Sequence, residues 1–154
     1  MVKKILIVLL VVLVVIQFIR PAKNDSKDFS KDITTVYPVP EDVMPILKRS
    51  CYDCHSNYTT YPWYDRIQPV AWWLQNHINE GKHHLNFSEF AGYTPKKQAH
   101  KLEETAEMIE KGEMPLGSYT FIHTDAKLSK EEATLLVNWA KSLQAEIEQK
   151  LAVN

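Results

Sequence analysis

Cys51, Cys54 and His55 form the pattern C-x-x-C-H, and the 154-residue chain contains no other cysteine. Cysteines three residues apart on one helical turn point to the same side of that turn. In this spacing each thiol can form a thioether with a vinyl group of haem, and the adjacent histidine can bind the iron. The pattern predicts one covalently attached haem c. A bound haem adds buried apolar surface, so a small domain can fold around it.

Three other uses of the two cysteines remain open. They can form a disulfide, or a thioredoxin-like redox pair, although no βαβ context for such a pair is visible. They can also contribute to a structural zinc site, which normally needs four ligands. The chain lacks a second cysteine pair, so histidines would have to complete that site, and the candidates are His77, His83 and His84.

The N-terminal twenty residues predict a membrane anchor. Lys3 and Lys4 precede an apolar run over residues 5–19, which only Gln17 interrupts and Arg20 closes. Residues 1–20 cover about 30 Å as a helix, close to the thickness of the hydrocarbon core. Small residues suited to signal-peptide cleavage are missing after the run, so we expect an uncleaved signal-anchor, with a cleaved signal peptide as the alternative. The charge bias places the N-terminus in the cytoplasm. The expected location is therefore the inner membrane, with a single pass and the haem domain in the periplasm.

The remaining residues divide into a linker over 21–40 and one domain over 41–154. The linker is polar and then rich in proline, with no helical period. After residue 20 the chain carries 15 basic and 19 acidic side chains, a net charge of about −4 with neutral histidines. This balance provides no basic patch for nucleic acid.

Four helices are expected in the domain, and no segment alternates long enough to require a strand. They cover about 41–54, 68–80 with a stop at Gly81, 95–112 with Thr94 as N-cap, and 130 to the end behind the capping box that starts at Ser129. The fold class is thus all-α, a cytochrome c-like small helical domain around a covalent haem, with loops at 56–67, 82–93 and 113–128.

The face of the iron opposite His55 needs its own assignment. Met114 is the first candidate metal ligand, because sulfur is a soft ligand for haem iron and Pro115 disfavours helical geometry at the methionine. His77, on an apolar helical face, is the alternative, and an open site is a third. Trp63 is expected to cover the edge of the porphyrin, and Arg66 to pair with a propionate.

Five segments carry a resemblance to a bacterial family of short, membrane-anchored, haem-binding domains related to cytochrome c. They read IQFIRP at 16–21, CYDCHSN at 51–57, YPWY at 61–64, LNFSE at 85–89 and GEMPL at 112–116. The resemblance covers nearly the whole chain. It implies covalent haem on Cys51 and Cys54, His55 as proximal ligand, and a role in electron transfer. The tryptophan-rich stretch over 61–77 departs from ordinary small cytochromes.

The leading hypothesis is a monohaem c-type cytochrome that passes one electron between redox partner proteins near the membrane. The sequence is more typical of an electron carrier than of an enzyme. A peroxidase or ligand sensor with an open or labile sixth site is the alternative, and a haem-free, zinc-stabilised interaction module is the second. The sequence does not predict the oligomeric state.

Overall fold

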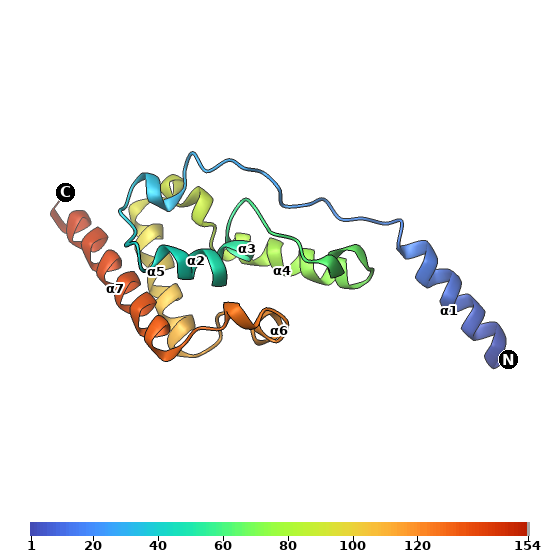
Figure 1. Ribbon diagram of the computed structural model, residues 1–154. Coiled ribbons are helices and arrows are strands. Elements are labelled where there is room, and N and C mark those ends of the chain that lie inside the picture. Colours follow the sequence, from blue (N-terminus) through green and yellow to red (C-terminus); the bar gives the residue numbers. More distant parts are fainter. Residues whose placement is uncertain (154) are drawn as a thin grey trace.

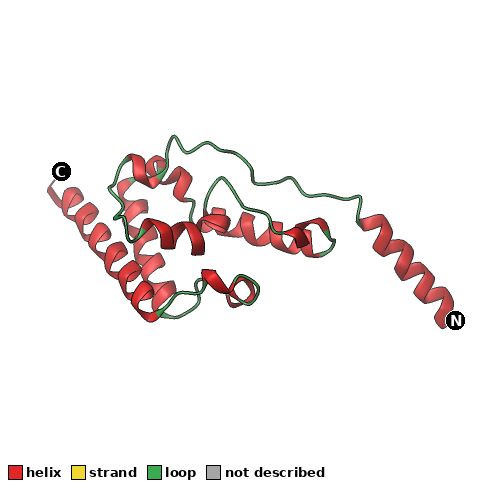
Figure 2. Cartoon of the chain, in the orientation of Figure 1, coloured by secondary structure: helices red, strands yellow, loops and turns green. Residues whose placement is uncertain are grey.

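Helices form all the regular structure in the part of the chain that the computed structural model describes, residues 1–153 (Figures 1 and 2). No strand occurs among these residues, which confirms the prediction of a helical chain. The α-helices are α1 (Val2–Ile16), α2 (Met44–Ser50), α3 (Tyr52–His55), α4 (Val70–His84), α5 (Pro95–Glu110), α6 (Gly117–Thr120) and α7 (Lys130–Val153). Short 3-10 helices are η1 (Ile33–Thr35), η2 (Trp63–Arg66), η3 (Phe87–Gly92) and η4 (Thr124–Ala126).

Helices α5 and α7 pack against each other along their length and form one side of the core (Figure 1). Apolar residues recur at helical spacing on both helices and are buried, and α2, η1 and η3 close the cluster. Its largest fully buried side chains are Phe87, Phe90, Ile33, Leu47, Leu102, Leu136 and Ile147. Each such side chain stabilises the fold by roughly 1.5–3 kcal/mol through burial.

The ends of α5 and the start of α7 follow the predicted capping residues. Thr94 accepts a hydrogen bond from the backbone N–H of Lys97 at the start of α5. In the capping box, Ser129 and Glu132 each accept from the backbone N–H of the other, at 3.1 and 2.9 Å. Glu132 also pairs with Arg49 at 2.7 Å, which ties the start of α7 to α2.

The expected single helix over 41–54 is wrong, because the chain leaves helical geometry at Cys51. This residue has φ −128° and ψ −43°, and it separates α2 from the single turn of α3. Tertiary contacts accompany the break. The Tyr52 ring stacks on Phe87 with centroids 5.2 Å apart, and its hydroxyl lies 3.2 Å from a carboxylate oxygen of Asp32.

The expected stop at Gly81 is also wrong, since α4 continues for three more residues to His84. Gly81 lies instead where α4 crosses α3. A Cβ at this position would lie 2.7 Å from the carbonyl oxygen of Cys54. The glycine is therefore required for close approach of the two helices. The expected loops at 56–67, 82–93 and 113–128 contain the short helices η2, η3, α6 and η4.

The N-terminal segment corrects the expected membrane anchor. Helix α1 has 15 residues, about 22 Å of rise, which is short of the ~30 Å hydrocarbon core. It ends at Ile16, and just beyond this end the Gln17 side-chain amide pairs with the backbone N–H and carbonyl of Gln68, at 2.9 and 3.1 Å. No helix within residues 1–153 combines the length and apolar character needed to cross a bilayer. The predicted transmembrane helix and single-pass inner-membrane location are wrong, and the periplasmic orientation inferred from them loses its basis.

Residues 21–40 lie along the domain, as Figure 1 shows in blue. Asn24 is buried, and its side-chain amide donates to the Ser56 carbonyl and to the Thr59 hydroxyl, both at 2.9 Å. Its amide oxygen accepts from Lys82 at 2.6 Å. The segment therefore holds the chain that leaves α3 against α4.

Candidate haem site

The two cysteines sit at the start and in the middle of the same short turn. Cys51 precedes α3 and Cys54 lies within it, and both thiols are free and half-buried. Burial raises the pKa of the Cys51 thiol to about 12, and that of the Cys54 thiol to about 11. Both groups are thus neutral thiols near pH 7. A redox-active pair of the thioredoxin type requires a lowered thiol pKa, so these electrostatics disfavour that alternative.

His55 is oriented by the end of α4. Its Nδ1 lies 3.0 Å from the backbone carbonyl oxygen of Leu85. Since a carbonyl oxygen only accepts, Nδ1 carries the proton and Nε2 keeps its lone pair. Burial lowers the pKa of His55, and this outweighs the carbonyls of Leu85 and Gly81, which favour the protonated ring. A neutral imidazole whose other nitrogen is held by a carbonyl is the usual form of a metal-binding histidine.

Asp53, between the two cysteines, fixes the turn from the other side. Its carboxylate accepts from the backbone N–H of Thr60 at 2.9 Å and from the Tyr119 hydroxyl at 2.9 Å. Its backbone carbonyl accepts from the Thr59 hydroxyl at 2.6 Å. Three hydrogen bonds from two distant segments therefore hold the turn that carries both thiols.

Met114 follows the C-terminal end of α5. Gly112 has φ +69°, and the backbone N–H groups of Gly112 and Glu113 donate to the carbonyls of Ile109 and Met108 at 3.0 and 2.9 Å. This is the Schellman pattern of helix termination. The backbone N–H of Met114 also donates to the Met108 carbonyl, at 3.2 Å, and its side chain is half-buried. The role of Met114 as an iron ligand stays a prediction.

His77 projects from α4 one turn before Gly81. Its Nδ1 lies 2.8 Å from the carbonyl oxygen of Trp73, and the two rings are 4.2 Å apart. The local bond again assigns the proton to Nδ1 and leaves Nε2 with its lone pair. His77 therefore stays the alternative sixth ligand.

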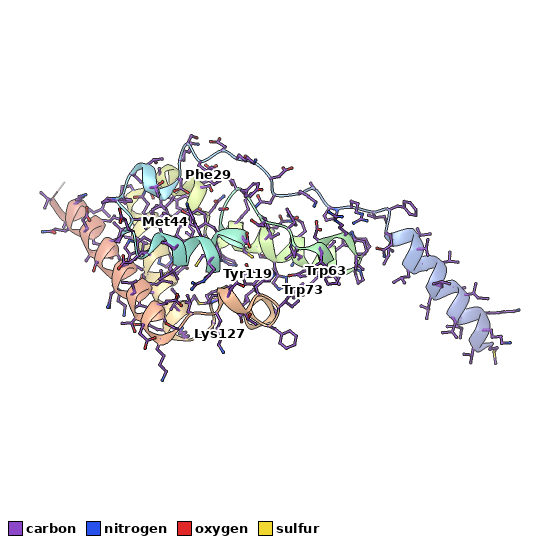
Figure 3. All side chains as sticks on the ribbon, viewed as in Figure 1. Phe29, Met44, Trp63, Trp73, Tyr119 and Lys127 are labelled. Atoms are coloured by element: carbon purple, nitrogen blue, oxygen red, sulfur yellow. The ribbon has the colours of Figure 1, made fainter. Side chains whose placement is uncertain are left out.

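Trp63 and Arg66 both lie on η2 and both are exposed. Trp63 is 75% exposed and packs edge-on against Tyr64, with centroids 5.8 Å apart. In Figure 3, Trp63 and Trp73 lie on the same side of α4, the side toward α6. Other large apolar side chains near these elements are also exposed, namely Ile67, Val70, Phe121 and Ile122. Exposed apolar surface of this kind is typical of a binding face. The roles of Trp63 and Arg66 toward haem stay predictions.

Two residues in the loop after Met114 connect it to the first half of the domain, Tyr119 to the motif and His123 to η2, and the sequence did not predict these contacts. Tyr119 donates to Asp53, and His123 Nε2 lies 2.7 Å from the Tyr64 hydroxyl. The Tyr119 and His123 rings stack at 4.5 Å, which their i, i+4 spacing allows. The i, i+4 pairing of Tyr119 with His123 was the available signal.

Neither the zinc alternative nor the groove beside the motif accounts for the two thiols and His55 together. Within residues 1–153 no group of three or more His, Cys, Asp or Glu side chains is placed to hold a metal ion, so the zinc alternative has no ligand set there. A groove of about 510 Å³ contains neither thiol and not His55. Its lining residues are Phe29, Asp32, Thr34, Met44, Lys48, Tyr52, Asp53, Ser56, Tyr58 and Thr60.

The donor set around α3 fits haem, because it offers a neutral imidazole nitrogen and two free thiols on one turn. A comparison with protein families agrees, since residues 11–142 match the family described as the haem-binding domain. The chain belongs to this haem-binding domain family. Haem binding, as predicted from the C-x-x-C-H motif, is thus supported. No curated protein and no solved structure matches this haem-binding domain at a significant level.

Proposed function

We propose that this haem-binding domain is a monohaem c-type cytochrome that transfers one electron at a time between redox partner proteins. When bound, haem supplies an iron that alternates between the ferric and ferrous states. The observation that carries the proposal is the arrangement of α3. Its two thiols are free and neutral, and His55 is held by the Leu85 carbonyl in the tautomer that binds iron.

Cys51 and Cys54 would each add across one vinyl group of haem. In each addition the sulfur bonds to one vinyl carbon and the thiol proton ends on the other, so no oxidant or reductant is consumed. The high thiol pKa values mean that little thiolate, the more reactive form, is present near pH 7. Attachment therefore needs either a catalyst or a chain that has not yet closed around α3.

His55 would bind the iron on one face through Nε2, and Met114 through its sulfur on the other. The backbone holds each ligand by an independent contact, His55 through Leu85 and Met114 through the end of α5. A histidine and a methionine ligand together favour a six-coordinate, low-spin iron with a raised reduction potential. This ligand set is suited to electron transfer.

The decisive experiment is production of the protein in a host with active haem-attachment machinery. We expect an intact mass larger than that of the polypeptide by one haem, and a reduced spectrum of a c-type cytochrome. A Cys51→Ser/Cys54→Ser double variant should lose the covalent mass. A colourless wild-type protein with the mass of its amino acids alone overturns the proposal.

Substitutions of the expected ligands test each face of the iron independently. His55→Ala should abolish the low-spin spectrum, whereas His77→Ala should leave it unchanged. Met114→Ala should lower the reduction potential and admit carbon monoxide, and Met44→Ala, which removes a half-buried methionine from the separate groove, is the matched control. Rapid carbon monoxide binding by the wild-type protein would instead favour the open-site alternative.

A further inference from the structure

Two polar contacts hold the loop after Met114, one on the turn that carries the thiols and one on η2. Tyr119, on α6, donates to Asp53 at 2.9 Å, and His123 contacts the Tyr64 hydroxyl on η2 at 2.7 Å. The Tyr119 and His123 rings stack with an interplanar angle of 20°. We call these four residues the clasp. In Figure 3, Tyr119 lies between α6 and the α3–α4 pair.

The clasp fixes one end of the segment that contains Met114. The other end is fixed by α5, through the hydrogen bonds from Gly112, Glu113 and Met114 to its last turn. Only residues 115–118 lie between Met114 and Tyr119, the nearest residues of these two attachments. The position of the methionine side chain is therefore determined by where α5 ends and by where Tyr119 meets Asp53.

The contact between Tyr119 and Asp53 is the stronger half of the clasp. The acceptor is a carboxylate, and hydrogen bonds to ionised groups are about twice as strong as those between neutral groups. Tyr119 is also half-buried, so water competes poorly for its hydroxyl. The acceptor itself lies between Cys51 and Cys54, so the bond joins the methionine segment directly to the haem-attachment turn.

We propose that Tyr119, acting through Asp53, is the positioning residue that holds Met114 against the iron face opposite His55. This inference rests on the proposed function, because it assumes attached haem and the methionine ligand. Without the bond, α6 loses its tie to α3, and only the contact of His123 with Tyr64 still holds this end of the methionine segment. The iron should then spend part of its time without the sulfur ligand.

The test compares haem-loaded wild-type protein with Tyr119→Phe, which keeps the ring and its stacking and removes only the hydroxyl. The matched control is Tyr37→Phe, which removes a hydroxyl bonded at 2.7 Å to Gln98. Imidazole is the probe, because it binds only where the sulfur has left. Its apparent affinity rises in proportion to the open fraction, so we expect a gain of roughly tenfold or more for Tyr119→Phe. The sulfur-to-iron charge-transfer band should weaken in parallel.

Further variants make the result decisive. Asp53→Asn keeps a neutral hydrogen-bonding group but loses the charge, so it should open the site by a smaller factor than Tyr119→Phe, and the Tyr119→Phe/Asp53→Asn double variant should add little to Tyr119→Phe alone. Tyr37→Phe should bind imidazole like the wild type, and circular dichroism should show the same helix content throughout. If Tyr119→Phe and Asp53→Asn also bind imidazole like the wild type while Met114→Ala binds it readily, the inference is wrong and the proposed function stands. If Met114→Ala itself changes nothing, the sixth-ligand assignment is wrong, and this inference fails with it.

Discussion

Replacement of Gly81 by alanine tests the close approach of α3 and α4, and two opposing effects decide whether the free energy of unfolding rises or falls. Alanine is favoured over glycine in a helix interior by about 1 kcal/mol, so α4 alone would gain stability. Against this, the new Cβ would lie 2.7 Å from the Cys54 carbonyl oxygen and 3.2 Å from the Cys54 carbonyl carbon. Ordinary contact begins at 3.4 Å, so the oxygen must move by about 0.7 Å.

The Cys54 backbone cannot easily give way, because its turn is held on both sides. His55 is bound to Leu85 and Asp53 to Tyr119, so α3 must shift as a unit. Overpacking of this kind costs roughly 1–3 kcal/mol, and helix propensity offsets about 1 kcal/mol of it, so we expect Gly81→Ala to lower the free energy of unfolding by up to about 2 kcal/mol.

Urea unfolding followed by circular dichroism measures this difference, with an unchanged m-value as the check that only stability has changed. Gly92→Ala is the control, since its Cβ would meet only the flexible Lys31 side chain, at 3.5 Å. We expect the control to stay within about 0.5 kcal/mol of the wild type. If Gly81→Ala is as stable as the wild type or more so, the tight contact between the helices does not exist in solution, and the explanation of this glycine is refuted.

Three further predictions follow from contacts elsewhere. Asn24→Ala should destabilise the protein by about 3 kcal/mol in urea unfolding, because two buried partners lose their hydrogen bonds. The control is Asn76→Ala on the exposed side of α4, which should change little, and equal effects would show that the N-terminal segment is not docked. In the haem-free protein, Cys51 and Cys54 should be alkylated by iodoacetamide much more slowly at pH 7.5 in the folded than in the unfolded chain. Mass spectrometry that shows equal rates would contradict their burial. The hydrogen bond from the Ser129 backbone N–H, and to a smaller extent the bond from Arg49, lower the pKa of Glu132 below its usual 4.5. The charge of Glu132 therefore stabilises the fold above pH 4.5, and this contribution is lost as pH falls through the lowered pKa. Glu132→Gln should therefore be less stable than the wild type at pH 7, with the difference shrinking below pH 4; a constant difference would assign the effect to packing.

Local signals were sufficient where a helix end depends on neighbouring residues. Thr94 with Pro95 and the capping box at Ser129 predicted the starts of α5 and α7, because these side chains bond backbone groups within three positions. Gly112 predicted the end of α5 in the same way. The C-x-x-C-H motif belongs to this class too, since its spacing alone indicates haem.

The errors arose where a contact joins residues distant in sequence. Gly81 looks like a helix stop until α3 is placed against it, and Gln17 looks like a polar interruption of an apolar helix until Gln68 binds it. The break at Cys51 accompanies the stacking of Tyr52 on Phe87. Hydropathy and helical periodicity contain no information about such pairs. For the same reason the bond from Tyr119 to Asp53, 66 positions apart, could not be predicted.

Hydrogen bonds at the junction between α1 and the domain couple the direction of α1 to the direction of α4, which a flexible joint would leave independent. Gln17 is paired with Gln68, and the Ile19 carbonyl accepts from Gln68 and from the Trp72 indole, so the chain is fastened where α4 begins. Helix α4 in turn crosses the turn that carries both thiols. Any molecule that fixes the direction of α1 therefore also sets the orientation of the turn that carries Cys51, Cys54 and His55.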